Sequence, residues 1–266
     1  MGESRGRNFA ALRVGLIGNA FRLINIRHIL GIPVHDITYA ETLDWFTEAI
    51  AANAARQVCT VNPEFVMRAQ HDKEFRHVLS KADLCLPDGQ GLLWAARARR
   101  KPLHERVAGS TLTWRIAARA AEYGWRLYLL GAAQGVAERA AEILAAYYPD
   151  LNVVGTYSGS PQPEEAARII ARVREAQPDI LFVAYGAPQQ DFWIARHRDE
   201  LGVPVMMGIG GSLDFVTGTA VRAPEWLQRL GLEWLHRLII EPWRWRRMLA
   251  LPKFIWAVLT RRDAVI

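Results

Sequence analysis

The sequence has little of what marks a disulfide-rich or membrane-spanning protein. It holds two cysteines among 266 residues, Cys59 and Cys85, and both lie in apolar runs without metal or redox spacing. A disulfide framework is therefore excluded, and reduced thiols in a cytosolic core are expected. No uncharged apolar run approaches the ~20 residues that span a bilayer. The N-terminus lacks the apolar region and cleavage site of a signal peptide, so we expect a cytoplasmic protein.

Common nucleotide and metal signatures are missing as well. No Asp-x-Asp pair occurs, the seven histidines have no metal-ligand spacing, and the pattern G-x-x-x-x-G-K-[ST] is absent. The segment Gly15-Leu16-Ile17-Gly18 has part of a dinucleotide fingerprint, but it lacks the remaining spacing. The sequence therefore predicts a site without a metal ion or a cofactor. Arginine or helix dipoles would then neutralise a phosphorylated leaving group.

What is present is an ordinary globular composition with an uneven charge distribution. Hydrophobic residues make up 51% and charged residues 23%, which excludes a disordered or fibrous chain. The formal net charge is +6, yet residues 221–266 hold 9 of the 33 basic and 4 of the 27 acidic residues. The same segment holds five of the ten tryptophans. A nearly neutral body with a basic, tryptophan-rich tail is therefore predicted.

Short β-rich runs alternate with longer helical patterns from residue 57 onward. This alternation predicts βαβ units, and hence a Rossmann-like parallel sheet with helices on both faces. The predicted strands are Gln57–Val61, Asp83–Leu86, Arg126–Leu130, Asn152–Tyr157, Asp179–Tyr185 and Val203–Ile209. The predicted helices are Pro63–Ser80, Gly91–Arg100, Ser110–Tyr123, Gly135–Tyr148, Pro163–Ala176 and Pro188–Leu201.

The segments on either side of this block differ from it. Gly31–Thr38 is predicted as a short β segment, and Glu41–Ala54 as an amphipathic helix with Leu43, Phe46 and Ile50 inward. Residues 1–30 show no clear pattern, and from residue 222 helices alternate with prolines. We therefore divide the chain into an N-terminal extension (1–30), an α/β domain (31–221) and a helical appendage (222–266).

Every predicted strand ends in small or polar residues. Ligands of open α/β sheets bind beyond these carboxyl ends, and glycines there let backbone N–H groups approach an anion such as a diphosphate. The candidate site residues at the strand ends are Thr60, Asn62, Asp88, Gly131, Gly186, Gln190, Gly210, Gly211 and Asp214.

Structural roles compete with these functional ones. Glycine and proline after a strand are ordinary turn residues. Asp88 could cap a helix or shape a turn, and Asp214 could cap a helix that starts near Phe215. Asn62 precedes Pro63, as in a plain helix start. Arg106 lies shortly before a predicted helix, where it could face a diphosphate or be a surface arginine.

Several long motifs, in order from about Gly31 to Pro252, resemble the WecG/TagA/CpsF glycosyltransferases. The motifs that carry the resemblance are Thr60-Val61-Asn62-Pro63-Glu64, Pro87-Asp88-Gly89, Arg106-Val107-Ala108-Gly109-Ser110, Gly186-Ala187-Pro188-Gln189-Gln190, Gly208-Ile209-Gly210-Gly211-Ser212-Leu213-Asp214-Phe215, Arg222-Ala223-Pro224-Glu225-Trp226 and Gly231-Leu232-Glu233-Trp234.

The resemblance implies an inverting, metal-independent transfer of a sugar from a UDP-sugar donor to a polyprenyl-diphosphate-linked sugar acceptor. Donors of the N-acetylmannosamine type and products for teichoic acid or exopolysaccharide synthesis are implied. By similarity, Asp88 is the catalytic base, and Arg106 acts near the diphosphate. Thr60, Asn62 and Gln190 would hydrogen-bond donor or acceptor. The segment from Gly210 to Asp214 would line the nucleotide-sugar site.

The tail suits a protein that works on a lipid-linked acceptor. Tryptophan and arginine on amphipathic helices favour an anionic bilayer surface, so we expect a peripheral protein at the inner face of the cytoplasmic membrane. A tail folded onto the body is the alternative. The predicted membrane-docking residues are Arg237, Trp243, Arg244, Trp245, Arg246 and Arg247.

Two other functions stay open from the residues alone. One is a nucleotide-dependent oxidoreductase on the same sheet, and the other is a non-enzymatic basic membrane adaptor. Nucleic acid is a poor partner for a nearly neutral body whose basic residues gather at one tryptophan-rich end. The donated sugar and a homo-oligomeric state are not determined by the sequence.

Overall fold

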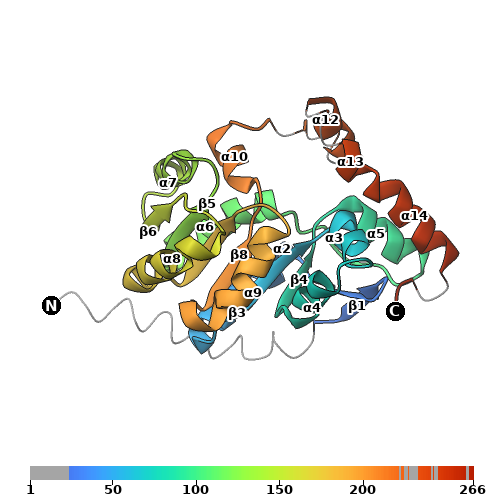
Figure 1. The fold of residues 1–266 in the computed structure, drawn as a ribbon, viewed down its shortest axis with the longest axis horizontal. Helices are drawn as coiled ribbons and strands as arrows, with labels where there is room; N and C mark the ends of the chain where they lie inside the picture. The colour runs from blue at the N-terminus through green and yellow to red at the C-terminus, as the bar shows by residue number, and fades with distance from the viewer. Residues whose placement is uncertain are drawn as a thin grey trace.

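The structure, a computed structural model, describes residues 24–221, 223–224, 227, 233–240, 242, 245–261 and 264–266. Its centre is a six-stranded sheet in the order β4-β3-β8-β7-β5-β6 (Figure 1). Every neighbouring pair is parallel, which confirms the predicted α/β class. The strands are β3 (Arg56–Val61), β4 (Leu84–Pro87), β5 (Arg126–Gly131), β6 (Asn152–Tyr157), β7 (Ile180–Ala184) and β8 (Val205–Gly208).

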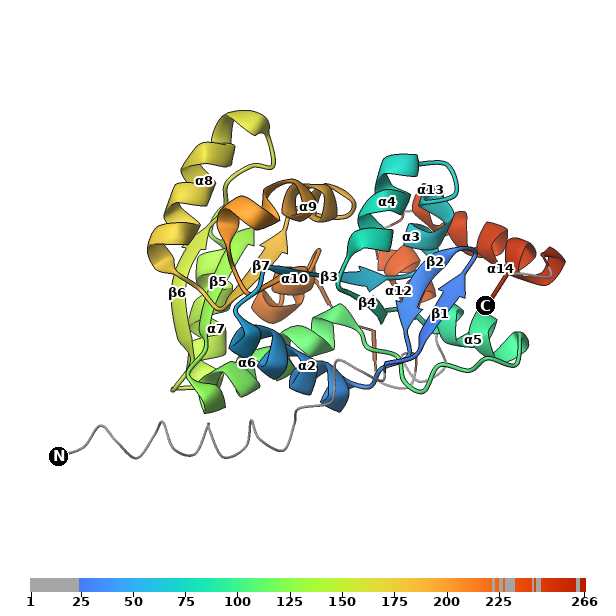
Figure 2. The same ribbon diagram turned by 90° about the horizontal axis from the view of Figure 1, so that it is seen from below.

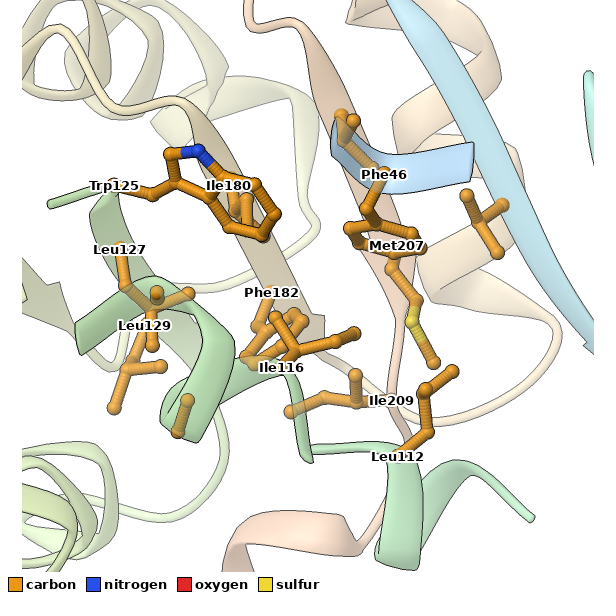
Figure 3. Close-up of a cluster of buried hydrophobic side chains, with 14 of the residues drawn as sticks. Phe46, Leu112, Ile116, Trp125, Leu127, Leu129, Ile180, Phe182, Met207 and Ile209 are labelled. Atoms are coloured by element: carbon orange, nitrogen blue, oxygen red, sulfur yellow. The ribbon is translucent and has the colours of Figure 1, made fainter. Parts of the chain in front are cut away.

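Helices cover both faces of this sheet because successive strand residues point to opposite sides. Leu127 and Leu129 of β5 pack into one cluster with α2, α6, α7 and α10, as Figure 3 shows in part. Tyr128 and Leu130 pack with α8 and α9 on the other side. The helices are α2 (Tyr39–Ala52), α6 (Gly109–Tyr123), α7 (Val136–Tyr147), α8 (Pro163–Ala176), α9 (Gln189–Leu201) and α10 (Ser212–Thr217).

Over β3 and β4, the second face is covered by other elements. Cys59 and Cys85 contribute to a third cluster with α3 (Pro63–Arg68), α4 (Lys73–Lys81) and α5 (Gln90–Ala98). The sequence predicts one helix over Pro63–Ser80, and this is wrong. The Asp72 carboxylate accepts the Phe75 N–H at 2.9 Å and so starts a second helix.

A two-stranded antiparallel hairpin precedes the large sheet. It pairs β1 (Ile26–Ile29) with β2 (Ile32–His35) through a turn at Leu30 and Gly31, both at positive φ. Sequence patterning assigns residues 26–29 to the N-terminal extension, whereas the structure places them in this hairpin. Helix α2 follows, two residues earlier than predicted, because the Thr38 side chain and Glu41 form a capping box. Phe46 is fully buried and Leu43 and Ile50 are partly buried, as expected.

The carboxyl-terminal part of the chain returns to the body. It contains α12 (Glu233–Ile240), α13 (Trp245–Met248) and α14 (Ala250–Thr260). Phe254 of α14 is fully buried in the cluster under α3, α4 and α5. The Ile266 N–H then donates to the His28 carbonyl at 3.0 Å, so the chain end lies beside β1 (Figure 2). The end of the tail is therefore folded onto the body, which agrees with the alternative to a purely membrane-docked tail.

Candidate functional site

The site lies where two adjacent strands send the chain to opposite faces of the sheet. After β3 the chain enters α3 on one face, and after β8 it enters α10 on the other. Such a switch point is where open α/β sheets bind their ligands. Thr60, Asn62 and Asp88 come from β3 and β4 at this edge, so the structure brings these three predicted residues together.

Asp88 directly follows β4 and is held by the backbone on two sides. Its N–H donates to the Val61 carbonyl at 2.7 Å, which ties it to the end of β3. One carboxylate oxygen, Oδ2, accepts the Gly109 N–H at 3.2 Å from the first residue of α6. Gly89, not Asp88, is the N-cap of α5, so Asp88 does not cap the helix that follows it. The carboxylate is partly exposed and its orientation is set from outside its own loop.

Arg106 lies across from Asp88 and carries the positive charge of the site. Burial alone would lower the Arg106 pKa, but the negative charges of Asp88 and Glu233 outweigh it and raise that pKa. The guanidinium donates to the Glu233 carboxylate of α12 at 2.5 Å. Its side chain is 20% exposed, so Arg106 is not an ordinary surface arginine. Its Nε–H is buried and has no hydrogen-bond partner within the described residues.

Tyr39 supports the Arg106 segment, and sequence reasoning did not find it. The Ala108 N–H donates to the Tyr39 hydroxyl at 2.8 Å, and the Tyr39 N–H donates to Glu105 at 2.8 Å. The Arg115 guanidinium lies 4.1 Å from the centre of the tyrosine ring. Burial raises the pKa of this phenol, so it stays neutral. No local pattern connects residues this far apart in the chain.

Thr60 and Asn62 fill the space beside Asp88. A Cβ added at Gly109 would lie 3.2 Å from Thr60 Cγ2 and 3.6 Å from Asp88 Oδ2, so the three residues are neighbours. Asn62 is the N-cap of α3, and its Oδ1 accepts the Phe65 N–H at 3.0 Å. The structural role of Asn62 is thus confirmed. A contact with substrate would have to use its Nδ2 amide group.

Gln190 is more deeply buried than we expect for a residue that contacts substrate. It is 1% exposed, and its Oε1 accepts the Gly210 N–H at 2.9 Å. A Cβ at Gly208 would lie 2.6 Å from its Nε2. The side chain of Gln190 therefore holds the backbone of the loop after β8 in place at Gly210. Direct hydrogen bonding to a substrate stays an untested prediction.

The remaining predicted residues lie farther along the same edge. Gly131 ends β5, and Gly186 and Gly210 follow β7 and β8; all three have positive φ, which favours glycine. Gly211 is the N-cap of α10. Asp214 sits within the first turn of that helix, so the expectation that it caps a helix near Phe215 is wrong. The structure does not test whether these residues contact a ligand.

A second residue that sequence reasoning missed is a buried carboxylate next to β3. Asp191, in the first turn of α9, is completely buried, and its backbone carbonyl accepts from Gln57 of β3 at 3.0 Å. Within the described residues, neither carboxylate oxygen has a well-formed hydrogen bond, and the thiol of Cys59 is only a weak donor to it. Burial raises the pKa of Asp191 to about 7, against a smaller opposing effect of the Cys59 thiol.

The predicted membrane-docking residues are only partly described. Trp243 and Arg244 lie outside the described residues, as do the side chains of Arg237, Arg246 and Arg247. Trp245 begins α13 and is 52% exposed. Within the described part of the chain, no helix is long and apolar enough to cross a bilayer.

Comparison with known proteins gives one consistent result. Residues 27–264 match the model of the "Glycosyl transferase WecG/TagA/CpsF family". A relative from Bacillus subtilis (strain 168) is 34% identical over 232 residues, covering 85% of this chain and 90% of the relative. One from Bacillus spizizenii is 36% identical and covers 82% and 84%, and one from Staphylococcus aureus (strain NCTC 8325) is 28% identical and covers 86% and 91%. All three are named "N-acetylglucosaminyldiphosphoundecaprenol N-acetyl-beta-D-mannosaminyltransferase".

Proposed function

Because this chain belongs to the WecG/TagA/CpsF family of glycosyltransferases, we propose that it transfers N-acetylmannosamine from UDP-N-acetylmannosamine to N-acetylglucosamine on undecaprenyl diphosphate. The product would enter teichoic acid or a related cell-surface polymer. The names of the relatives support this donor and this acceptor. The observation that carries the mechanism is the Asp88 carboxylate at the β3–β4 edge, held by Gly109 and facing Arg106.

In the proposed reaction, Asp88 is the general base of a single inverting displacement. Its carboxylate takes the proton from the acceptor hydroxyl as that oxygen bonds to the anomeric carbon. The bond between the anomeric carbon and the UDP oxygen breaks on the opposite side, and UDP leaves with the electron pair. A β-linked product, as in the names of the relatives, is consistent with attack by one activated hydroxyl.

Arg106 is proposed to stabilise the departing diphosphate. Its charge is permanent, and charges of fixed position in a partly buried site stabilise developing negative charge strongly. The same guanidinium now pairs with Glu233, so a diphosphate would replace one anionic partner with another. We therefore propose a reaction that needs no metal ion and no cofactor.

The glycines at the ends of β5, β7 and β8 are proposed to admit the nucleotide. Gly186 and Gly210 have open space where a side chain would begin, so their backbone can be approached closely. Thr60 and the Nδ2 amide of Asn62 would contact a sugar next to Asp88. Gln190 and Asp214 would shape the nucleotide part of the site.

We also propose that the tail attaches the enzyme peripherally to an anionic membrane surface. The exposed Trp245 supports this, together with Ile239 and Trp256, which are each 71% exposed. The arginines at 237, 244, 246 and 247 would add attraction of about 1 kcal/mol each near anionic lipid.

The direct test is a UDP-release assay over a panel of UDP-sugars, with a short-chain polyprenyl-diphosphate N-acetylglucosamine as acceptor. We expect UDP release that depends on acceptor and is fastest with UDP-N-acetylmannosamine. Mass spectrometry of the product would identify the added residue. Acceptor-dependent release with another UDP-sugar alone would overturn the proposed donor, and no release with any donor would overturn the proposed reaction.

A further inference from the structure

Helix α5 of the body lies against α14 of the tail along its whole length. At its start, a Cβ at Gly91 would lie 3.5 Å from Leu251 and 3.8 Å from Phe254. At its end, the Arg99 guanidinium donates to the backbone carbonyls of Val258, Leu259 and Arg261. The two helices are therefore joined at both ends and form one unit, as Figures 1 and 2 agree.

Each helix of this pair leaves large apolar side chains in solvent. Trp94 of α5 is 40% exposed. On α14, Ile255 is 36%, Leu259 58% and Trp256 71% exposed. A single exposed tryptophan needs no explanation, but two neighbouring helices that both expose apolar side chains indicate an interaction surface.

The two segments that contain these helices carry charges of one sign. The segment 89–104 holds Arg97, Arg99, Arg100 and Lys101 and no acidic residue. The segment 245–261 holds four basic residues and again no acidic one. Arg97, Arg100 and Lys101 are exposed and make no ion pair within the described residues. Among the described residues, no acidic side chain of either helix therefore offsets this charge.

We infer that α5 of the catalytic body, together with α14, binds the surface of an anionic phospholipid bilayer, with Trp94 in the headgroup region and Arg97, Arg100 and Lys101 against the lipid phosphates. This rests on the proposed function, because a lipid-linked acceptor has to be met at a membrane. It extends the proposed membrane contact from the tail to helix α5 of the body.

The chemistry of the surface favours a bilayer over other occupants. Nucleic acid would account for the cations but not for the aliphatic Ile255 and Leu259. A second copy of this chain would bring like charges together. An anionic bilayer accounts for both the basic and the apolar side chains, because aromatic rings and aliphatic chains enter the interface while basic residues contact the headgroups.

The position of α5 gives this surface a consequence for the reaction. The helix begins at Gln90, two residues after Asp88, so Trp94 lies only about one turn into the helix that follows the proposed base. A membrane that contacts α5 would present the acceptor diphosphate at the level of the headgroups, close to the β4 end of the sheet.

The experiment compares full-length variants in co-sedimentation with phosphatidylcholine vesicles that contain about one quarter phosphatidylglycerol. The test variant combines R97Q, R100Q and K101Q, and a second variant is Trp94→Ala. The matched control combines R168Q, R172Q and R174Q on α8, which lies at the other edge of the sheet (Figure 1). Both triple variants remove the same charge.

We expect the α5 triple variant to partition roughly 100-fold less well than the wild type, at about fivefold per charge. Trp94→Ala should give a smaller loss that persists at high salt, and the α8 variant should bind nearly as the wild type does. Transfer to the short-chain soluble acceptor should be unchanged in all three. Equal losses in the two triple variants, or wild-type binding by the α5 variant, would overturn the inference.

The two proposals fail in different ways. A wild-type enzyme that binds vesicles through α5 but does not use the short-chain acceptor would overturn the proposed function. An α5 variant that also loses transfer to the soluble acceptor would place α5 in catalysis and overturn its role as a lipid-binding surface.

Discussion

The rim of the β3–β4 edge and the interior beneath it hold two aspartates in opposite situations. At the rim, Asp88 accepts a backbone N–H from α6 and faces the Arg106 guanidinium. In the interior, Asp191 has no neighbouring cation, and burial raises its pKa to about 7. Both carboxylates belong to segments that follow a strand of one sheet. Their surroundings, and not their place in the sequence, distinguish them.

The difference shows what a carboxylate needs in order to act as a base. A base must be ionised at working pH, which takes hydrogen-bond donors or positive charge to offset lost hydration. Asp88 accepts the Gly109 N–H and has a neighbouring cation, whereas Asp191 is completely buried with only the Cys59 thiol and its own backbone as donors. We therefore place the chemistry at the rim and a structural role in the interior.

The largest expected effect comes from Asp88→Asn, which removes the proposed base and keeps the shape of the side chain. We expect kcat to fall by about 10²-fold to 10⁴-fold, the usual contribution of one general base. Circular dichroism and the melting temperature should stay close to those of the wild type. The measurement is UDP release under saturating donor and acceptor.

A matched control is Asp199→Asn, since the Asp199 carboxylate is 95% exposed on α9. It should leave kcat unchanged. Near-normal turnover in Asp88→Asn would show that Asp88 is not the general base. The two aspartates would then not differ in function as we propose.

The next largest effect is expected from Asp191→Asn, which replaces the buried carboxylate of the interior. The pKa of Asp191 is about 7 in the folded protein and near 4 in the unfolded chain, so the wild type loses stability as pH rises between those values. Above pH 7 the full cost is present, roughly 4 kcal/mol in the free energy of unfolding. Asparagine does not titrate, so the variant should gain this amount over the wild type between about pH 4 and pH 8.

Urea denaturation of both proteins across that pH range measures the effect. The pKa of His35 is lowered by burial, so His35 destabilises the fold as pH falls, but it does so in both proteins and cancels in the difference. A gain that does not change with pH would mean that Asp191 is already ionised in the folded protein.

The contrast between rim and interior also separates the features that can be predicted from the sequence from those that cannot. Strand order along the chain, most helix bounds and the position of Asp88 after a strand follow from local patterns of apolar residues and turns. The burial of Asp191 and the support of Arg106 by Tyr39 depend on residues distant in sequence, and no local pattern encodes them. Of the β1–β2 hairpin, the predicted β segment Gly31–Thr38 contains β2, but β1 escaped prediction because its four residues are too few for a clear alternation.

Arg106→Gln removes the positive charge beside Asp88 and so tests its role in the reaction. If Arg106 stabilises the leaving diphosphate, its loss should lower kcat by about 100-fold, as the loss of one preorganised donor commonly does. Arg106→Lys keeps the charge but loses the fork of donors, so it should recover part of the rate. Single-turnover transfer measures both, and equal rates in the two variants would mean that charge plays no part.

The smallest effect is expected from Glu233→Gln, which removes the anion that now pairs with Arg106. Because Glu233 and a diphosphate compete for one guanidinium, the variant should bind UDP about twofold to fivefold more tightly, the usual range for a pair near the surface. Isothermal titration with UDP measures this. Weaker binding would show instead that Glu233 holds Arg106 in its place beside Asp88, so that the site depends on a residue of the tail.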